Sequence, residues 1–380
     1  MGLNEKFFKS ASGGIVADEN FNTVTYTGNG SSQAISSVGF QPDMVWVKLR
    51  SSASNPPPHA LFDSVRGVGK ILQVNVSDQE ANLSPNGVSS FNSNGFSVTD
   101  VSGGNNAVNG ASGGTFSGDA NYVAWCWYAP TSETNTSGTI TTTIKKNVDA
   151  GFSIFTYDGA TNATADTSNN GGGYYSVGHG LGVAPALVIV KKTSGAGSWY
   201  VGGTALGSSG TNGNHMVLNS AAKQVGEANI LWGGGQTFND TTFGLGAWDV
   251  VNRRNDSYVA YCFANKSGYQ KVGTYTGNGN TNGPIIYTTD NGASGGANGF
   301  RPRFIIAKPI SVADNWSLWD NVRETGDNLD QILVPNNSGA ESANGFGRYN
   351  ITLSSSGFQI KQTDDQINKA NETYLFWAIA

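Results

Sequence analysis

Short apolar runs, separated by clusters of Gly, Asn, Ser and Thr, follow one another along the whole chain. Runs of this length, bounded by turn residues, are typical of β-strands, and no segment shows sustained helical periodicity. The content of 52 Gly, 9 Trp, 14 Tyr and 18 Phe points the same way, because Gly serves turns and aromatic residues suit a pleated surface. The pattern therefore predicts an all-β fold.

One strand pattern occurs three times, in which a Pro leads an apolar run that a Lys closes. A Pro is tolerated at the entrance of a strand, where no ladder donor is required, and the unbroken apolar run indicates burial. The copies are residues 39–48, 182–191 and 299–308.

Two further patterns frame this strand in each copy. An opening strand precedes a Gly/Asn turn at residues 24–30 and 272–279, with a looser copy at 155–159, and we expect these turns to form hairpins. An aromatic strand closes each copy, at residues 122–127, 258–263 and 374–379. The spacing from the Pro to the closing Tyr is 80, 73 and 72 residues, so the copies are expected to be domains.

This periodicity divides the chain into an arm, three repeats and a linker. Six to eight short strands per repeat favour tandem two-sheet antiparallel β-sandwich domains, with a jelly roll as one form. The expected boundaries are an N-terminal arm at 1–21, repeats at 22–130, 151–267 and 268–380, and a linker with one alternating strand at 131–150.

Charge and cysteine content narrow the range of functions. Only 13% of residues are charged, and the net charge of −5 without a basic stripe disfavours a nucleic-acid partner. We expect neither a signal peptide nor a membrane-inserted segment, so the chain should be made in a cytoplasm. Cys126 and Cys262 occupy equivalent positions in two repeats and are expected to be buried free thiols.

Catalytic and metal-binding patterns are weak. The histidines His59, His179 and His215 lie far apart in turn-rich settings, with no spacing that suggests zinc. A carboxylate pair among Asp240, Asp249 and Asp256 would suit glycoside hydrolysis, but no counterpart recurs in the other repeats. We therefore expect no enzyme activity and no cofactor, and we assign no metal site; the Asp- and Asn-bearing loops, such as residues 78–82, supply oxygen ligands that leave calcium open. The candidate carboxylates for the minority alternative, a polysaccharide depolymerase, are these three Asp residues.

Aromatic pairs are the better binding candidates. Trp199 with Tyr200, and Trp316 with Trp319, follow a polar loop after the Pro-led strand in two repeats. Exposed, these rings would stack on a sugar or anchor a protein partner. The alternative is that they are core residues of the next strand.

The repeated markers Y-T-G-N-G, G-F-x-P-D-x-V-W-x-K, F-D-S-V-R-G and Y-V-A-W-C-W resemble the repeated domains of structural proteins from marine tailed bacteriophages, including cyanophages. The start at residues 7–11 is similar as well, so nearly the whole chain is covered. The resemblance implies a virion component, such as a tail fibre, a tail-associated protein or a capsid fibre, with concanavalin-like or jelly-roll lectin domains. The middle repeat departs from it because it lacks the F-D-S-V-R element.

These observations lead to one expected function and one main alternative. Phe7, Phe8 and Lys9 would dock the arm onto other virion proteins, and the repeats would contact a host surface glycan or envelope protein from outside the particle. By analogy with fibres we expect a homo-oligomer, with a trimer as the first choice. The alternative is a capsid decoration or cement protein.

Overall fold

The computed structural model describes residues 15–51, 53–99, 108–111, 119–160, 175–209, 212–228, 231–233, 238–246, 248–341 and 349–380. We call the described residues within 15–130, 131–267 and 268–380 units 1, 2 and 3. Nearly all regular structure is β, as expected, and every pairing between the named strands is antiparallel. The helical elements in these ranges are η1 (Ala17–Glu19), η2 (Thr204–Leu206), α1 (Asp249–Asn252) and α2 (Asp365–Asn368).

Each unit contains one large sheet built on the same four strands. The opening strand pairs with the closing strand, which pairs with the Pro-led strand, which pairs with the strand that follows it. In unit 1 the order is β1 (Phe21–Thr27), β9 (Asn121–Trp127), β3 (Met44–Leu49), β4 (Ala60–Asp63), β5 (Lys70–Gln73) and β6 (Ala81–Asn82). In unit 3 the order is β21 (Gln270–Thr276), β28 (Thr373–Ile379), β23 (Phe304–Pro309) and β24 (Ser317–Asp320).

Unit 2 has the same arrangement with additions at both edges. Its four equivalent strands are β12 (Phe152–Asp158), β20 (Ser257–Phe263), β14 (Leu187–Lys192) and β15 (Trp199–Gly202). Beyond β15 lie β17 (Asn212–Val217), β16 (Ser208–Ser209) and β18 (Val225–Ala228). At the other edge, β10 (Thr131–Asn135) and β11 (Thr142–Asn147) extend the sheet next to β12. The segment expected to be a linker with one strand is thus a two-stranded part of unit 2.

A small sheet faces each large sheet, and a separate apolar cluster of buried residues draws on both. The small sheets are β2 (Gln33–Ile35), β8 (Gly95–Thr99) and β7 (Gly87–Asn92) in unit 1, β13 (Tyr175–Gly178) and β19 (Thr242–Leu245) in unit 2, and β22 (Ile285–Tyr287), β27 (Gly357–Ile360), β26 (Ile351–Ser354) and β25 (Asn328–Leu329) in unit 3.

The Gly/Asn turns after the opening strands do not form hairpins, contrary to the sequence prediction. The turn at residues 28–30 carries the chain from β1 in the large sheet to β2 in the small one. Buried Asn109 holds it, since its side-chain oxygen accepts from the Asn29 backbone N–H at 3.1 Å and its amide donates to Asn29 Oδ1 at 3.1 Å. Asn368 holds the turn at Asn278 in the same way.

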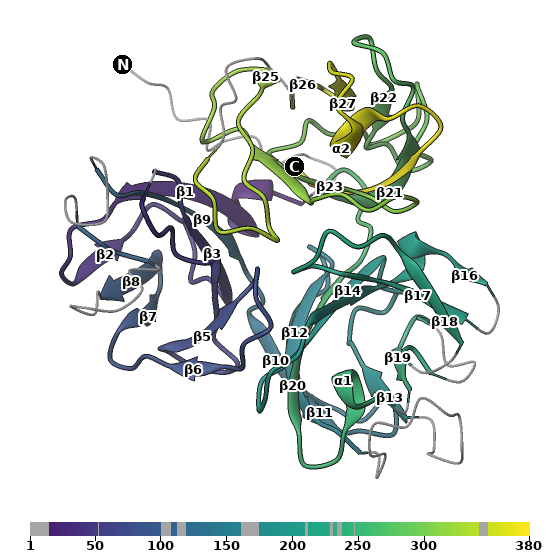
Figure 1. The fold of residues 1–380 in the computed structure, drawn as a ribbon. Coiled ribbons are helices and arrows are strands. Elements are labelled where there is room, and N and C mark those ends of the chain that lie inside the picture. Colours follow the sequence, from purple (N-terminus) through teal and green to yellow (C-terminus); the bar gives the residue numbers. More distant parts are fainter. Residues whose placement is uncertain are drawn as a thin grey trace.

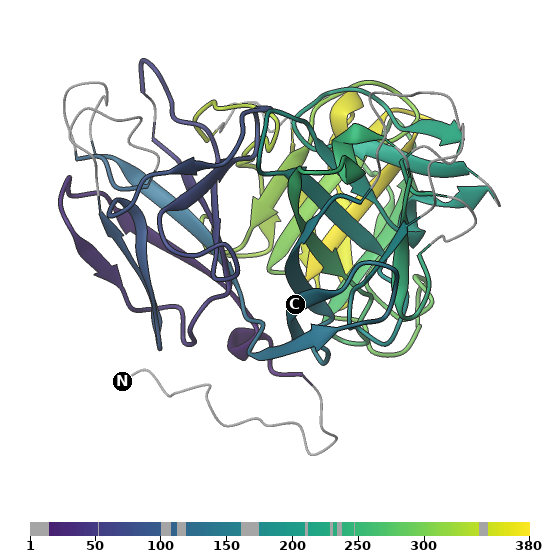
Figure 2. The same cartoon turned by 90° about the horizontal axis from the view of Figure 1, so that it is seen from below.

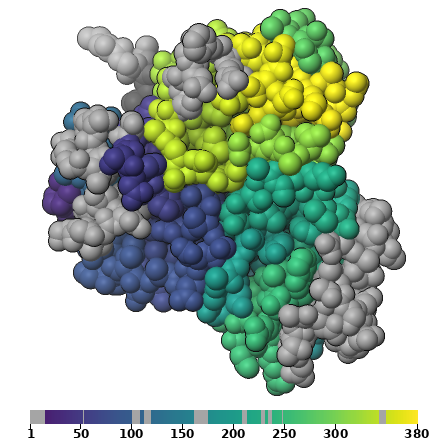
Figure 3. All heavy atoms as spheres, in the orientation of Figure 1, coloured from purple at the N-terminus to yellow at the C-terminus, as the bar shows by residue number. Residues whose placement is uncertain are grey.

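The closing strands are apolar on both faces, and this decides how the units sit together. Successive side chains of a strand point to opposite faces. On β9, Tyr122, Ala124 and Cys126 belong to the cluster inside unit 1, whereas Trp125 and Trp127 belong to a second cluster that includes residues of all three units. Figure 1 shows the three units arranged around this common centre, and Figure 3 shows them in contact along their borders. We call the second cluster the central core.

Aromatic rings from the three units meet in the central core. Trp127 of unit 1 stacks on Trp377 of unit 3 with ring centroids 5.8 Å apart, and Phe263 of unit 2 lies 4.3 Å from Trp377. Phe304 of unit 3 meets Trp127 edge-on at 5.7 Å. Because these rings are almost completely buried, the units share one core instead of standing as a string of separate domains.

The described N-terminal segment and the C-terminus both lie close to this centre. Ile15, which precedes η1, and Ala17, the first residue of η1, pack against the central core, as does Ala380. Seen from below, η1 lies at the lower edge of the body, about midway across it, and the C-terminus lies nearby (Figure 2). The described part of the chain therefore begins and ends beside the junction of the three units.

We predict that Trp127→Ala destabilises all three units together, by about 3–5 kcal/mol, because it opens a cavity where their rings meet. Urea unfolding followed by tryptophan fluorescence measures this. Val183→Ala, at a side chain that is 41% exposed, is the control and should change the free energy of unfolding by less than about 0.5 kcal/mol. Equal effects of the two substitutions would contradict a shared core.

Candidate functional site

The four aromatic residues expected to bind a ligand on the surface are buried. Trp199 and Trp319 are 0% exposed, Trp316 is 3% exposed and Tyr200 is 9% exposed. Trp199, Tyr200 and Trp319 lie on the strands that follow the Pro-led strands, and Trp316 directly precedes such a strand. The alternative, that these are core residues, is therefore correct, and the expectation of exposed rings is wrong. Tyr200 contacts the cluster inside unit 2, and Trp319 belongs to the one inside unit 3.

Trp199 and Trp316 instead lie at the junctions between units. The Trp199 indole donates to the Gln73 carbonyl of unit 1 at 2.9 Å, and the Trp316 indole donates to the Val217 carbonyl of unit 2 at 3.1 Å. A buried indole N–H is stabilised by such an acceptor. Each ring therefore fills the border with the next unit and also satisfies a carbonyl there.

His59 occupies the third equivalent position, in unit 1. It directly precedes β4, as Trp316 precedes β24, and its Nδ1 accepts from the Trp46 indole at 3.0 Å. That bond leaves Nε2 as the protonated nitrogen, 3.1 Å from the Val334 carbonyl of unit 3. Burial lowers the pKa of His59 well below its ordinary value, so the ring is neutral. Sequence reasoning missed this equivalence because the residue type differs.

The Lys that closes each Pro-led strand makes a second set of junction contacts. Each ammonium is buried and donates to a backbone carbonyl of the next unit, so that unit 1 contacts unit 3, unit 2 contacts unit 1, and unit 3 contacts unit 2. The contacts are Lys48 to Ser338 at 2.8 Å, Lys191 to Ser77 at 3.2 Å and Lys308 to Ala221 at 3.2 Å. The same cyclic order in both sets gives the body an approximate threefold symmetry.

Burial disfavours the charged form of these lysines. It lowers the pKa of Lys48 to about 7, and those of Lys191 and Lys308 to about 8. Each ammonium also donates to a carbonyl of its own unit, for example Lys191 to Gly197 at 2.7 Å. The lysines are thus held by carbonyl oxygens at the borders.

A buried aspartate completes two of the three junctions. Asp63 of unit 1 accepts from the Tyr261 hydroxyl of unit 2 at 2.8 Å, and Asp320 of unit 3 accepts from the Trp125 indole of unit 1 at 3.1 Å. Both donors lie on closing strands and face the central core. The recurring D-x-V-R sequence therefore places an acid where the neighbouring unit presents a donor.

Buried arginines neutralise these acids. Arg66 contacts Asp63 at 2.5 Å, and Arg323 contacts Asp320 at 2.5 Å. Each arginine also pairs with a glutamate: Arg66 with Glu80 at 3.1 Å, and Arg323 with Glu341 at 2.6 Å, while Glu341 also pairs with Arg50 of unit 1 at 2.9 Å.

The junction between units 2 and 3 lacks this acid. Gly203 stands at the equivalent position, with a φ of 127°, and a Cβ there would lie 2.3 Å from the Ala186 carbonyl oxygen. The equivalent donor, the Trp377 indole, turns to Gln270 Oε1 at 3.2 Å. The missing F-D-S-V-R element of the middle repeat is thus replaced by a local acceptor.

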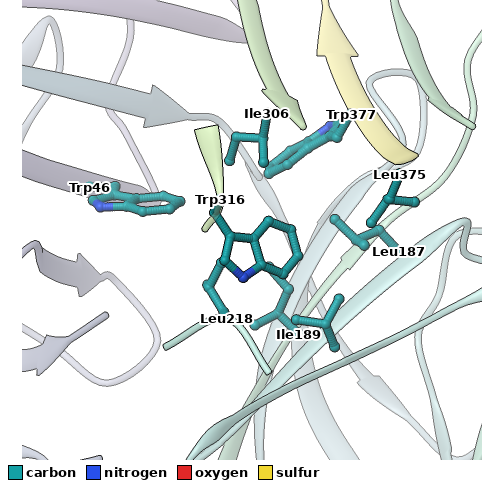
Figure 4. Close-up of a pocket in the computed structure, with 9 residues that line it drawn as sticks. Trp46, Leu187, Ile189, Leu218, Ile306, Trp316, Leu375 and Trp377 are labelled. Carbon is teal, nitrogen blue, oxygen red and sulfur yellow. The ribbon is translucent and has the colours of Figure 1, made fainter. Parts of the chain in front are cut away.

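A cavity of about 10 Å³ remains at the centre, lined by apolar side chains of all three units (Figure 4). Trp46, Leu187, Trp316 and Trp377 are among its lining residues. A space of about this volume holds at most one water, and apolar cavities of this kind stay dry. The centre therefore serves packing and not ligand binding.

The remaining chemical candidates have structural surroundings. Cys126 and Cys262 are buried free thiols, as expected, and burial raises the pKa of both. His179 is buried in the loop after β13 with both ring nitrogens hydrogen-bonded, in the turn-rich setting expected, whereas buried His215 lies on strand β17 and corrects that expectation. Although burial raises the pKa of Asp256, hydrogen bonds from Lys192 and Ser194 bring it below the ordinary value.

Within the described ranges, no group of three His, Cys, Asp or Glu side chains could hold a metal ion. Nor does any described helix have the length and apolarity needed to cross a membrane. Phe7, Phe8 and Lys9, the expected docking residues, lie outside the described residues.

Comparisons with known proteins give one match. A family model described as a domain of unknown function, DUF7483, covers residues 17–380. No curated protein and no solved structure matches the chain significantly.

We predict that Asp320→Ala lowers the free energy of unfolding by about 3–5 kcal/mol, because it leaves Arg323 with one carboxylate and the Trp125 indole without an acceptor. The matched control is Asp327→Ala, which removes an exposed ion pair with Arg301 and should cost about 1 kcal/mol or less. Urea denaturation of both variants provides the comparison. Similar small losses would mean that the buried acid does not hold the junction.

Lys48→Met should change how stability depends on pH. Burial lowers the pKa of Lys48 from its ordinary 10.5 to about 7. Between these two values the unfolded chain binds more protons than the folded chain, so the wild-type free energy of unfolding rises with pH. The slope due to this group is at most about 1.4 kcal/mol per pH unit. Urea denaturation of both proteins from pH 6 to 10 gives the free energy of unfolding of the wild type minus that of Lys48→Met. This difference should rise with pH, and a difference that does not change with pH would contradict the prediction.

Proposed function

The chain belongs to the DUF7483 family, and we propose that it is a bacteriophage virion structural protein on the outside of the particle. In this proposal it is a tail fibre or tail-associated protein. The arm attaches it to other virion proteins, and the three-unit body meets a host surface glycan or envelope protein.

The observation that carries this proposal is the single central core shared by three units of one chain. Its buried aromatic rings and polar junctions join the units without any disulfide between the two cysteines. A protein made in a reducing cytoplasm and then displayed outside needs stability of this kind. The repeated outer faces supply surface for contacts, and the buried histidines and thiols have packing and hydrogen-bonding roles.

We also propose that each unit is a β-sandwich domain of jelly-roll or concanavalin-like form. The supporting observation is that each large sheet encloses a separate apolar cluster with its small sheet. Consecutive strands of unit 1 change sheets after β1 and again after β2, which is characteristic of chains that wind around a two-layer core.

The threefold-like arrangement bears on the oligomeric state. A fibre homotrimer places three copies about one axis, whereas this chain supplies three similar units by itself. We propose that one chain can occupy a threefold position on the particle.

The compact body also favours the second candidate function, capsid decoration or cementing. Units that surround one core do not project as a string, and a flat contact with neighbouring subunits suits such a shape. Copy number separates the two: decoration gives tens to hundreds of chains on the capsid, and a tail fibre gives few.

We predict that deletion of residues 1–12 abolishes incorporation into particles while the body stays folded. The described contacts of Ile15 and Ala17 with the central core remain in this variant. Mass spectrometry of purified particles measures incorporation, and circular dichroism with a melting curve measures folding. Normal incorporation, or loss of folding, would refute docking through the arm.

A further inference from the structure

An open groove of about 440 Å³ lies where the hairpin β10–β11 meets unit 1. Its wall on the side of unit 2 comes from β10, β11 and β12, and Ser64 and Val65, in the turn after β4, form its side in unit 1. Pockets that hold small ligands commonly have volumes of 300–1,000 Å³. The groove is therefore large enough for a ligand of more than one ring.

Unpaired hydroxyl groups line the groove. In the described part of the chain, the side-chain hydroxyls of Ser132, Thr141, Thr143 and Thr156 have no hydrogen-bond partner. Each can donate one hydrogen bond and accept others. The methyl groups of the three threonines, together with Val65, add small apolar surfaces between these polar atoms. This mixture suits a molecule that carries many hydroxyls on a carbon ring.

The two charged residues of the groove already have protein partners. Lys145 pairs with Asp43 of unit 1 at 2.8 Å, and Asp43 also accepts from the Ser64 hydroxyl at 2.6 Å. Asp158 accepts from the Ser257 hydroxyl at 2.7 Å. Because Asp43 neutralises the charge of Lys145, the groove attracts an anion only weakly. Its surface therefore favours a neutral ligand.

The groove spans more than one sugar ring along the strands. Lys145 pairs with Ile154 on β12, and Asp158 lies four residues further along the same strand, so the two ends are about 13 Å apart. Thr143 and Thr156 lie between them, and Ser132 pairs with Lys145 at one end. An elongated ligand would run along β11 and β12.

This feature belongs to one junction alone among the described strands, because the hairpin exists only in unit 2. Thr25 on β1 and Thr274 on β21 are equivalent to Thr156 on β12, because each of the three pairs with the third residue of its closing strand. No hairpin extends β1 or β21. These threonines are therefore matched controls.

We infer that this groove binds a neutral oligosaccharide. The inference rests on the proposed contact with the host surface and names the ligand class and the residues for it. Ser132, Thr143 and Thr156 supply hydrogen bonds to sugar hydroxyls, and Val65 contacts the apolar face of a ring.

The test is binding of the purified full chain to an array of neutral and acidic oligosaccharides, followed by calorimetry with the best neutral ligand. The double variant Thr143→Val with Thr156→Val should weaken binding tenfold or more, because it removes two hydroxyls at nearly constant volume. Ser132→Trp, at an exposed position of β10, should block the groove and abolish binding. Thr25→Val should bind as the wild type does.

Three outcomes would overturn the inference: no binding of any neutral oligosaccharide, a preference for acidic ones, or full binding by Ser132→Trp. If the double variant loses its fold, Ser132→Trp decides alone. Particle incorporation of the wild-type chain separates the two proposals. A wild-type chain that is present on the particle and binds no neutral oligosaccharide refutes the groove alone, and its absence from the particle refutes the virion role.

Discussion

The packing of aromatic side chains from the three closing strands and their neighbours holds the body together. Each closing strand buries both faces, one against the small sheet of its own unit and the other against the two neighbouring units. Burial of a large aromatic side chain is worth several kcal/mol, and Trp127, Phe263 and Trp377 each contribute to a cluster that no single unit could cover. A separated unit would expose this face to water. The association of the units is therefore part of folding itself.

Apolar contact is not directional, so the polar contacts at the borders are needed to fix how the units are oriented. The buried ammonium groups, the indoles of Trp199 and Trp316, and the acids Asp63 and Asp320 each gain a partner across the border only when one particular neighbour is correctly placed. An unpaired buried group would be costly, which penalises other arrangements. The junction between units 2 and 3 uses Gln270 in place of an acid, so the cyclic order tolerates one substitution.

Much of the fold could be predicted from the sequence, and the assembly of the units could not. The Pro-led run ending at Lys48 and its two copies are buried strands, as their patterns indicate. The closing strands are apolar at every position, which requires cover on both faces, yet the pattern does not say what covers the second. The sequence around Trp199 and Trp316 would look the same whether these residues lay on the surface or at a junction. His59 occupies the equivalent position in unit 1, but its different residue type gives no sign of this in the sequence. The groove could not be predicted from the sequence, because it depends on a hairpin whose polar composition is typical of a linker.

Small-angle X-ray scattering of the purified chain tests most directly whether three units share one core. A closed body of 380 residues should have a radius of gyration of about 21 Å and a single compact peak in its pair-distance distribution. Three separate domains in a row would give a radius of gyration of roughly 30 Å or more and an extended tail in that distribution. The first result is the one expected from the central core, and the second would contradict it.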